Sequence, residues 1–299
     1  GKIFGGASDP LLVSVRSGAA VSMPGMMETI LNLGLNDDTV EGLARQSKNP
    51  RFAWDSYRRF VQMYGCVVFD LPKHPFEEML AERKKAAKVS RDIDLPAEDM
   101  QALVKAFKAY ITSATGKDFP DKPVDQLWGA IEAVFESWHT KRAVDYRRLH
   151  DIPDSMGTAV NIVTMVFGNL GEGSGTGVAF TRDPSTGERV LYGEYLLNAQ
   201  GEDVVSGSRD PEPIEKLRQT LPAAFGELER VARTLERHFR DVQDLEFTIE
   251  NGKLYMLQTR RAQRTGHASV RIACEMVDEG LITQEEAVAR IPPMDLDQL

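Results

Sequence analysis

The chain has 299 residues, a formal net charge of −9, and 42% hydrophobic and 27% charged residues. This composition is that of an ordinary globular protein and excludes disordered, collagen-like and coiled-coil chains. The excess of acidic residues gives no general attraction for nucleic acid or an anionic membrane. No apolar run approaches the roughly 18 residues that a membrane span needs.

The N-terminus lacks the basic, apolar and cleavage-site regions of a signal peptide, so we expect a fragment of a longer protein. The two cysteines, Cys66 and Cys274, have no CxxC or Cys/His metal spacing. This usage favours a reducing compartment over a zinc site or a disulfide framework. We therefore expect a cytoplasmic protein whose bound anions are held by local arginines.

An apolar strand at 11–15 opens the chain, and Arg16 follows it directly. In residues 16–31 we expect a Ser/Gly loop that becomes a helix. A strand that runs into such a turn and then a helix places backbone donors and an arginine near a ligand. The segment is therefore a candidate binding site.

Residues 37 to about 120 have apolar side chains at helical spacing and few strand signals, which predicts an inserted all-helical subdomain. The later sequence alternates strands and helices. The expected elements are a helix or helix pair at 124–150, a buried strand at 160–167, a glycine-rich segment at 168–177, a strand to 182 and a returning strand at 190–192, a helix at 224–239, a hairpin at 245–259, and two final helices, the second with a Thr283–Glu286 capping box.

Glycines stand at 171, 173, 175 and 177, so every second residue lacks a Cβ and the backbone can approach phosphate oxygens closely. The spacing matches neither a dinucleotide fingerprint nor a P-loop. The residues alone leave two interpretations open, a flexible hairpin tip and a loop that covers phosphates.

Acidic and hydroxyl side chains alternate with apolar ones in the final hairpin, which puts Asp244, Glu246 and Thr248 on one face of a strand. Carboxylates in this arrangement suit Mg²⁺, which prefers oxygen ligands and bridging phosphates. The return strand adds an oxygen ligand at Gln258 and a permanent cation at Arg260. The alternative is an amphipathic strand with a solvated acidic face.

Hairpin register decides whether such a site can form. With a two-residue loop at Asn251-Gly252 and a regular ladder, Gln258 lies on the face opposite Glu246. With a three-residue loop at 250–252, Gln258 pairs with Asp244 and shares the face of Glu246. A shared metal site requires the second register, which is the one we predict.

Taken together, these segments resemble the nucleotide-binding domain of the pyruvate, phosphate dikinase family, and the resemblance runs essentially end to end. The motifs that carry it are LLVSVRSGA at 11–19, MPGMMETILNLGLND at 23–37, SGTGVAFTR at 174–182, NAQGEDVV at 198–205 and LYMLQTR at 254–260. The Met-Pro-Gly-Met-Met stretch separates this family from the related phosphoenolpyruvate synthases.

The resemblance implies an α/β ATP-grasp fold with an inserted all-helical subdomain. Its expected domains are a first ATP-grasp subdomain formed by 1–36 with 121–168, whose N-terminal part is missing, the helical insert at 37–120, a second subdomain at 169–264, and a helical linker at 265–299 toward an absent phosphohistidine domain.

Site residues follow from the same resemblance. Arg16 is similar to the family's phosphate-binding and catalytic arginine, and Arg59 to a second one from the helical insert. Thr176, beside Gly175, resembles the residue that closes over the β and γ phosphates. The remaining expected ligands are Asp244, Glu246 and Gln258 for Mg²⁺ and ATP, and Arg260 for a phosphate.

The implied reaction transfers the β,γ-pyrophosphoryl group of ATP to a histidine on a separate domain. The terminal phosphoryl of this group then passes to phosphate, and the phosphohistidine that is left serves pyruvate in a barrel domain. Metal and guanidinium groups suit it because phosphoryl transfer depends on positioning and charge stabilisation. We expect partners in these two domains of a homodimeric full-length protein, and no nucleic acid or membrane. Gly266-His267-Ala268-Ser269 lacks the Thr-Ser pair of the carrier motif, so no carrier histidine is expected here and the fragment should not turn over alone.

The sequence leaves two alternatives to a dikinase function. One is a phosphoenolpyruvate synthase-like, histidine-directed phosphotransferase of the same fold. The other is a nucleotide-free structural module, and the joint presence of Arg16, Glu246 and Gln258 argues against it.

Overall fold

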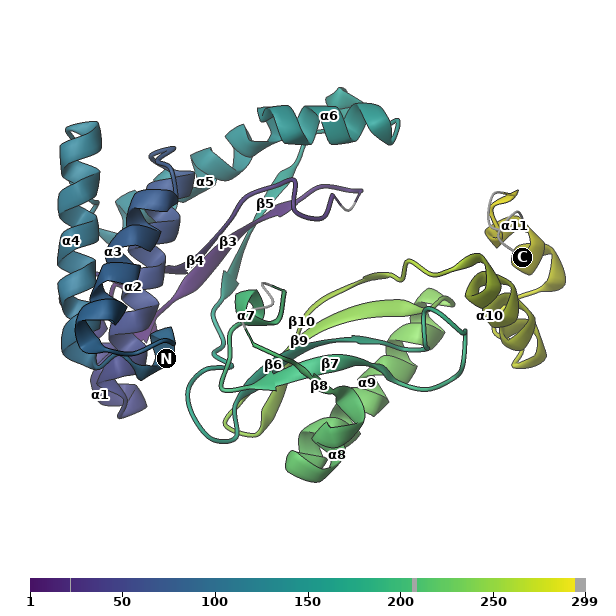
Figure 1. The fold of residues 1–299 in the computed structure, drawn as a ribbon. Coiled ribbons are helices and arrows are strands. Elements are labelled where there is room, and N and C mark those ends of the chain that lie inside the picture. Colours follow the sequence, from purple (N-terminus) through teal and green to yellow (C-terminus); the bar gives the residue numbers. More distant parts are fainter. Residues whose placement is uncertain (22, 206–208, 294–299) are drawn as a thin grey trace. The chain divides into compact units, whose positions relative to one another are not determined.

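The computed structural model describes residues 1–21, 23–205 and 209–293 and divides into two compact units, Gly1–Met165 and Val166–Leu299 (Figure 1). Ser22 of the expected N-terminal loop, and residues 294–299 of the expected C-terminal linker, lie outside the described residues. Among the helices that are described, none is long and apolar enough to cross a bilayer. The chain is thus a mixed α/β protein, as predicted.

The first unit combines helices with a three-stranded antiparallel sheet of order β4-β3-β5. Its elements are β1 Ile3–Phe4, β2 Pro10–Leu11, β3 Val13–Gly18, β4 Thr29–Leu33, α1 Thr39–Ser47, α2 Pro50–Val67, α3 His74–Ala87, α4 Ala97–Thr115, α5 Pro123–Glu136, α6 Lys141–Leu149 and β5 Ala159–Thr164, with 3₁₀ turns at Asp92–Asp94, Ser137–His139 and Asp154–Met156.

The predicted helical secondary structure of residues 37–120 is confirmed, because the regular elements described in that range are α1 to α4 and the 3₁₀ turn Asp92–Asp94. Local sequence explains the boundaries: the Asn49 side chain accepts a hydrogen bond from the Phe52 amide at the start of α2, and Gly116 ends α4 with φ +70°. Phe60 and Tyr64 of α2 pack edge to face with each other and with Phe119, which follows α4.

The helix expected within residues 16–31 is wrong. The strand that begins at Val13 continues through Arg16 to Gly18, and Thr29–Leu33 form β4 beside it. Ile30 and Leu33 are completely buried there. Tertiary packing of β-branched and apolar residues against β3 therefore overrides the local helical pattern.

The strand expected at 160–167 forms as β5, but it is shorter and is not buried. Ile162 and Val163 are 50% and 45% exposed. Since β5 is an outer strand of the described sheet, its backbone forms ladder hydrogen bonds with β3 along one edge only. An apolar, β-branched run therefore predicted the strand and mispredicted its burial.

The second unit is built around a five-stranded antiparallel sheet of order β10-β9-β6-β7-β8. Its elements are β6 Gly175–Phe180, β7 Tyr192–Leu197, α7 Gly201–Val205, β8 Glu212–Pro213, a 3₁₀ turn Ile214–Lys216, α8 Leu217–Thr220, α9 Pro222–Phe239, β9 Gln243–Glu250, β10 Lys253–Arg261, α10 Gly266–Asp278 and α11 Gln284–Arg290. The predicted Thr283–Glu286 capping box is present at α11.

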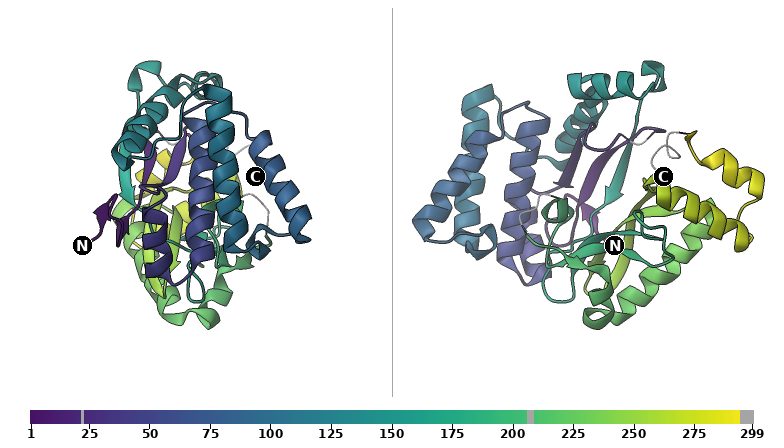
Figure 2. Two further views of the ribbon diagram at one scale, coloured as in Figure 1. Left: turned by 90° about the vertical axis from the view of Figure 1, so that its left-hand side faces the viewer. Right: turned by 45° about the vertical axis from the view of Figure 1, so that its right-hand side comes forward.

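Helix α9 covers one face of this sheet (Figure 2). Phe225 and Leu228 of the helix belong to the same buried cluster as Leu245, Phe247 and Ile249 of β9. Burying each such side chain is worth about 1.5–3 kcal/mol. By the alternation of β9, the acidic residues lie on the other face of the sheet.

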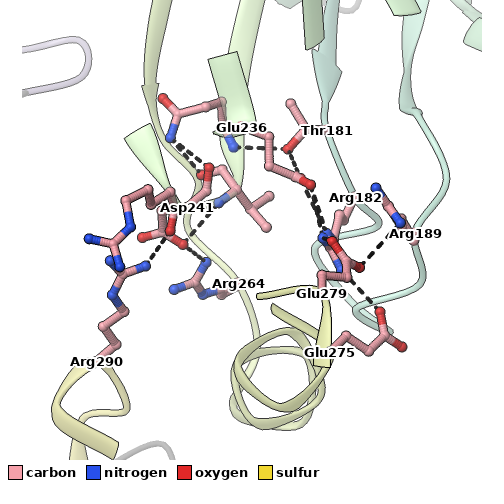
Figure 3. Close-up of polar contacts among 12 residues, drawn as sticks. Thr181, Arg182, Arg189, Glu236, Asp241, Arg264, Glu275, Glu279 and Arg290 are labelled. Carbon is pink, nitrogen blue, oxygen red and sulfur yellow. Dashed lines mark hydrogen bonds and ion pairs between the residues drawn. The ribbon is translucent and has the colours of Figure 1, made fainter. Parts of the chain in front are cut away.

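A buried arginine joins the sheet to the helices that follow it. Arg182 is fully buried just after β6, and its guanidinium binds Glu236 of α9 at 2.9 Å, Glu279 after α10 at 2.9 Å and Glu275 of α10 at 3.1 Å (Figure 3). Removing one partner from such a group leaves uncompensated buried charge. Arg182 is therefore a structural residue of the SGTGVAFTR motif.

We predict that Arg182→Ala lowers the free energy of unfolding by about 3–5 kcal/mol, because it leaves Glu236 buried without its cation. Urea denaturation measures the change. Arg189→Ala is the control: Arg189 contacts Glu279 at 3.4 Å but is 55% exposed, so its loss should cost at most about 1 kcal/mol. Equal losses in the two variants would contradict the structural role of Arg182.

Candidate functional site

The hairpin turn between β9 and β10 contains two residues, not the predicted three. Glu250 pairs with Lys253, and both Asn251 and Gly252 have positive φ, +50° and +79°. This is the backbone that a type I′ turn requires, and Asn-Gly is its preferred sequence. The three-residue loop is therefore wrong, because the Asn-Gly turn closes the hairpin without Glu250.

Gln258 nevertheless lies on the face of Glu246. The ladder runs regularly to the pair Met256 and Phe247, after which a bulge at Leu257 shifts the register and brings Gln258 directly opposite Glu246. An extra residue in one strand reverses the facing of everything beyond it. The bulge thus restores the shared face that a regular two-residue hairpin would have lost.

Asp244 takes a different partner from the expected one. It pairs across the strands with Arg260, whose Nε donates to its Oδ2 at 2.6 Å. Asp244, Glu246, Gln258 and Arg260 are thereby brought together on one sheet face. The predicted pairing of Asp244 with Gln258 is wrong, although their placement on a common face is right.

Thr176 completes this group from β6, where it lies opposite Thr248. Its side chain is buried, and its hydroxyl donates to the Phe247 carbonyl at 3.0 Å and lies 3.3 Å from the Thr248 hydroxyl. Gly175 begins the same strand, and a Cβ added there would meet the Leu196 carbonyl at 2.8 Å. Both residues therefore belong to the sheet, and the loop part of the glycine pattern lies before them.

The glycine-rich segment before β6 is tied to the hairpin turn. The Gly252 amide donates to the Gly173 carbonyl at 2.7 Å, and the Asn251 amide donates to Ser174 Oγ at 3.1 Å. Glu250 accepts from the Phe167 amide at 2.6 Å. These contacts argue against a freely flexible tip. Sequence reasoning missed Glu250 and Ser174, and the alternation of Glu250 with Glu246 was the available signal.

We predict that Glu250→Ala loosens the glycine-rich segment. A hydrogen bond to a charged acceptor is worth about 1.5–3 kcal/mol, so amide exchange at Phe167 should accelerate roughly ten- to a hundredfold in native conditions. Hydrogen exchange read by NMR measures it. Glu250→Gln, which retains an acceptor, should lie in between, and Glu227→Ala on α9 should have no effect. An unchanged Phe167 rate in Glu250→Ala would refute the assignment.

Arg16 and Arg59 belong to the first unit, Gly1–Met165. Arg16 is half-buried within β3 and pairs with Thr29 and Asn161 on the neighbouring strands, so it does not follow the strand at a turn as predicted. Strand alternation fixes the direction of its side chain.

Arg59 lies on α2 in a group of arginines around a single buried carboxylate. Arg58 binds Asp55 at 2.7 Å and is 3% exposed, whereas Arg59 Nε lies 3.5 Å from Asp55 and its side chain is 19% exposed. Arg51 adds a third cation at 3.8 Å. Burial raises the pKa of Asp55, but the three guanidiniums outweigh it and hold that pKa below its ordinary value.

This arrangement sets a pH dependence. Because the folded pKa of Asp55 is lowered, the unfolded chain binds the proton first, and the stability from ionised Asp55 is full above the ordinary aspartate pKa and is lost as pH falls through the lower folded value. We predict that Asp55→Asn destabilises the chain at pH 7 and that its deficit against the unmodified chain shrinks below about pH 4. Urea unfolding as a function of pH tests this, and a constant deficit down to pH 2 would contradict it.

The contacts within the β9–β10 hairpin limit which side chains can bind a metal ion. Among the described residues, no three His, Cys, Asp or Glu side chains are grouped so as to hold an ion. Glu246 and Gln258 are adjacent across the strands, and Asp244 is engaged by Arg260. One carboxylate and one amide oxygen form an open donor set, which fits an ion such as Mg²⁺ that keeps water and phosphate ligands.

Known proteins provide an independent comparison. The family model described as the pyruvate phosphate dikinase AMP/ATP-binding domain matches residues 2–225 and 216–281. A pyruvate, phosphate dikinase from Clostridium symbiosum is 60% identical over the whole chain, which covers 34% of that relative. Similar proteins from Rhizobium meliloti and, as a chloroplastic form, Arabidopsis thaliana are 54% and 53% identical over 100% and 98% of the chain, covering 35% and 30% of their lengths.

The chain thus spans about a third of the length of these relatives. The match of the family model extends over most of the sequence, including both arginine-bearing β3 and α2 and the β9–β10 hairpin. On this match, the chain belongs to the family of the pyruvate phosphate dikinase AMP/ATP-binding domain.

Proposed function

We propose that the chain is the ATP-binding part of a pyruvate, phosphate dikinase, which converts ATP, phosphate and pyruvate into AMP, diphosphate and phosphoenolpyruvate. The observation that carries this is the bulge at Leu257, which places Gln258 opposite Glu246 on a sheet face that α9 does not cover. A regular hairpin would need no such feature, whereas bulges recur where a side chain is re-aimed at a site.

The residue roles extend this proposal. Glu246 and Gln258, with Asp244 beside them, hold Mg²⁺, which when bound neutralises developing phosphate charge. Arg16 and Arg59 bind phosphates with their planar, permanently charged groups. Arg260 takes a further phosphate while fixing Asp244 at 2.6 Å, so it both orients an acid and supplies positive charge.

Gly175 and Thr176 have a more limited part than the resemblance implies. Because the Thr176 hydroxyl donates within the sheet, it can only accept from a ligand in this arrangement. The backbone before it, at Gly171 and Gly173, supplies the close approach to phosphate. The hydrogen bonds from the hairpin turn hold that backbone beside the strands that bear the acids.

For the domains, we propose an ATP-grasp fold whose first subdomain is 1–36 with 121–168, whose helical insert is 37–120 and whose second subdomain is 169–264. Residues 265–299 lead toward a phosphohistidine domain, and a pyruvate-binding barrel completes a homodimeric, cytoplasmic enzyme. The lengths of the relatives leave room for both domains.

The proposal predicts that Glu246→Gln or Arg16→Ala in the full-length protein lowers phosphorylation of the carrier histidine by ATP at least a hundredfold. The first substitution removes a carboxylate that holds Mg²⁺, and the second removes a cation that stabilises the charge of the transferring phosphates. Exchange of label between pyruvate and phosphoenolpyruvate should remain normal. Glu212→Gln, which alters an exposed ion pair with Lys216, is the matched control.

Loss of both half-reactions in either variant would assign that residue to folding. Retention of the ATP half-reaction by Glu246→Gln would remove it from the site. Neither result depends on how tightly this segment binds ATP by itself.

A further inference from the structure

Two adjoining hollows lie beside α9, on the side of the sheet away from Glu246 and Gln258. One has a volume of about 540 Å³ and the other about 250 Å³, and both are lined by Arg189, Arg233 and Glu236. The combined space is that of a typical small-molecule site. None of the residues proposed above to bind ATP lines either hollow.

Some of the charged side chains that line these hollows form ion pairs, and others do not. Glu236 and Glu279 are already bound by the buried Arg182, as Figure 3 shows, and Glu229 is bound by Arg218 at 3.2 Å. The side chains of Arg233 and Arg237, in contrast, have no ion pair or hydrogen bond within the described part of the chain, and the same holds for Glu215, which lines the larger hollow.

These two arginines stand four residues apart on α9, so their like charges face one another along the helix. Arg189 approaches the same space from the segment before β7 and lines both hollows. Such a pair of cations is unfavourable in a helix, and an anion bound between the two guanidiniums makes their proximity favourable.

The larger hollow has an apolar end. Leu191, Phe225 and Ala232 line it, and the Arg218 guanidinium lies over the Phe225 ring at 4.7 Å from its centroid. An aromatic group can stack against such a guanidinium. The larger hollow thus has an apolar end and an end lined by guanidinium groups. A ligand complementary to both ends carries an apolar group and an anion.

We propose that this hollow binds an organic phosphate that carries an aromatic group, with the ring toward Leu191 and Phe225 and the phosphate between Arg233 and Arg237. The guanidinium fork matches phosphate oxygens bidentately. The proposal does not rest on the ATP site, which the sheet separates from it.

The test uses 1-naphthyl phosphate as the probe, titrated into the 299-residue chain and followed by its fluorescence and by calorimetry. We expect one molar equivalent to bind. Inorganic phosphate, which lacks the ring, and 1-naphthol, which lacks the charge, should each bind at least tenfold more weakly. Equal binding of 1-naphthol would show an apolar surface only and would overturn the phosphate assignment.

Variants locate the probe. Arg233→Gln with Arg237→Gln should weaken binding at least tenfold, and both side chains are exposed, so the fold is not at stake. Arg230→Gln is the matched control, because Arg230 is on the same helix, its guanidinium pairs with Glu227 at 3.4 Å and it lines neither hollow. Glu246→Gln should leave binding unchanged. Equal losses in the double variant and Arg230→Gln, or a loss in Glu246→Gln, would overturn the site.

Discussion

The register of the β9–β10 hairpin is the constraint on which the candidate ATP site depends. Side chains on a strand alternate between faces, so a shift of one residue moves every later side chain to the other side of the sheet. The Asn-Gly turn sets one register, and the bulge at Leu257 changes it before Gln258. The turn and the bulge have opposite effects on the facing of Gln258, and together they place its amide on the same face as the Glu246 carboxylate.

The same turn also organises the glycine-rich segment. Amides of Asn251 and Gly252 donate to Ser174 and Gly173, so the backbone that could cover a phosphate is attached to the strands that could hold its metal. The two amides are available because Asn251 and Gly252 lie between the last paired residues of the strands, Glu250 and Lys253. The glycine-rich backbone and the strands that bear the proposed metal ligands are consequently joined by hydrogen bonds. A movement of the glycine-rich backbone away from the strands has to break these bonds.

Sequence patterns predicted those features that depend on local periodicity. The helices between 37 and 120, the amphipathic α9 and the Thr283–Glu286 capping box were all predicted, because each is encoded by side-chain spacing or by a short polar motif. The strand at Thr29–Leu33 was mispredicted, since its conformation comes from pairing with β3. The bulge was missed for a related reason. An extra residue in one strand has no signature in that strand alone and becomes visible only against the partner.

Among the site residues, the common face of Asp244 and Glu246 followed from alternation, whereas the face of Gln258 was predicted correctly from a three-residue loop that does not form. The partner of each acid was not predicted. Which acid meets Arg260 depends on a count of residues through turn and bulge together. The contacts of Glu250 with the Phe167 amide and of Ser174 with the Asn251 amide were equally hidden, because they join backbone amides to side chains about 80 positions apart. Long-range pairs of this kind are determined by topology.

The arginines show why residue type alone cannot separate a structural cation from a ligand-binding one. Arg182 stands in a motif typical of the family, yet its guanidinium is fully buried among three carboxylates and has no surface left for a ligand. Arg58 and Arg59 are adjacent in sequence, but helical geometry buries the first on Asp55 and leaves the second partly exposed. Since a guanidinium carries its charge at any accessible pH, its function is decided by how many of its donors the fold has already used.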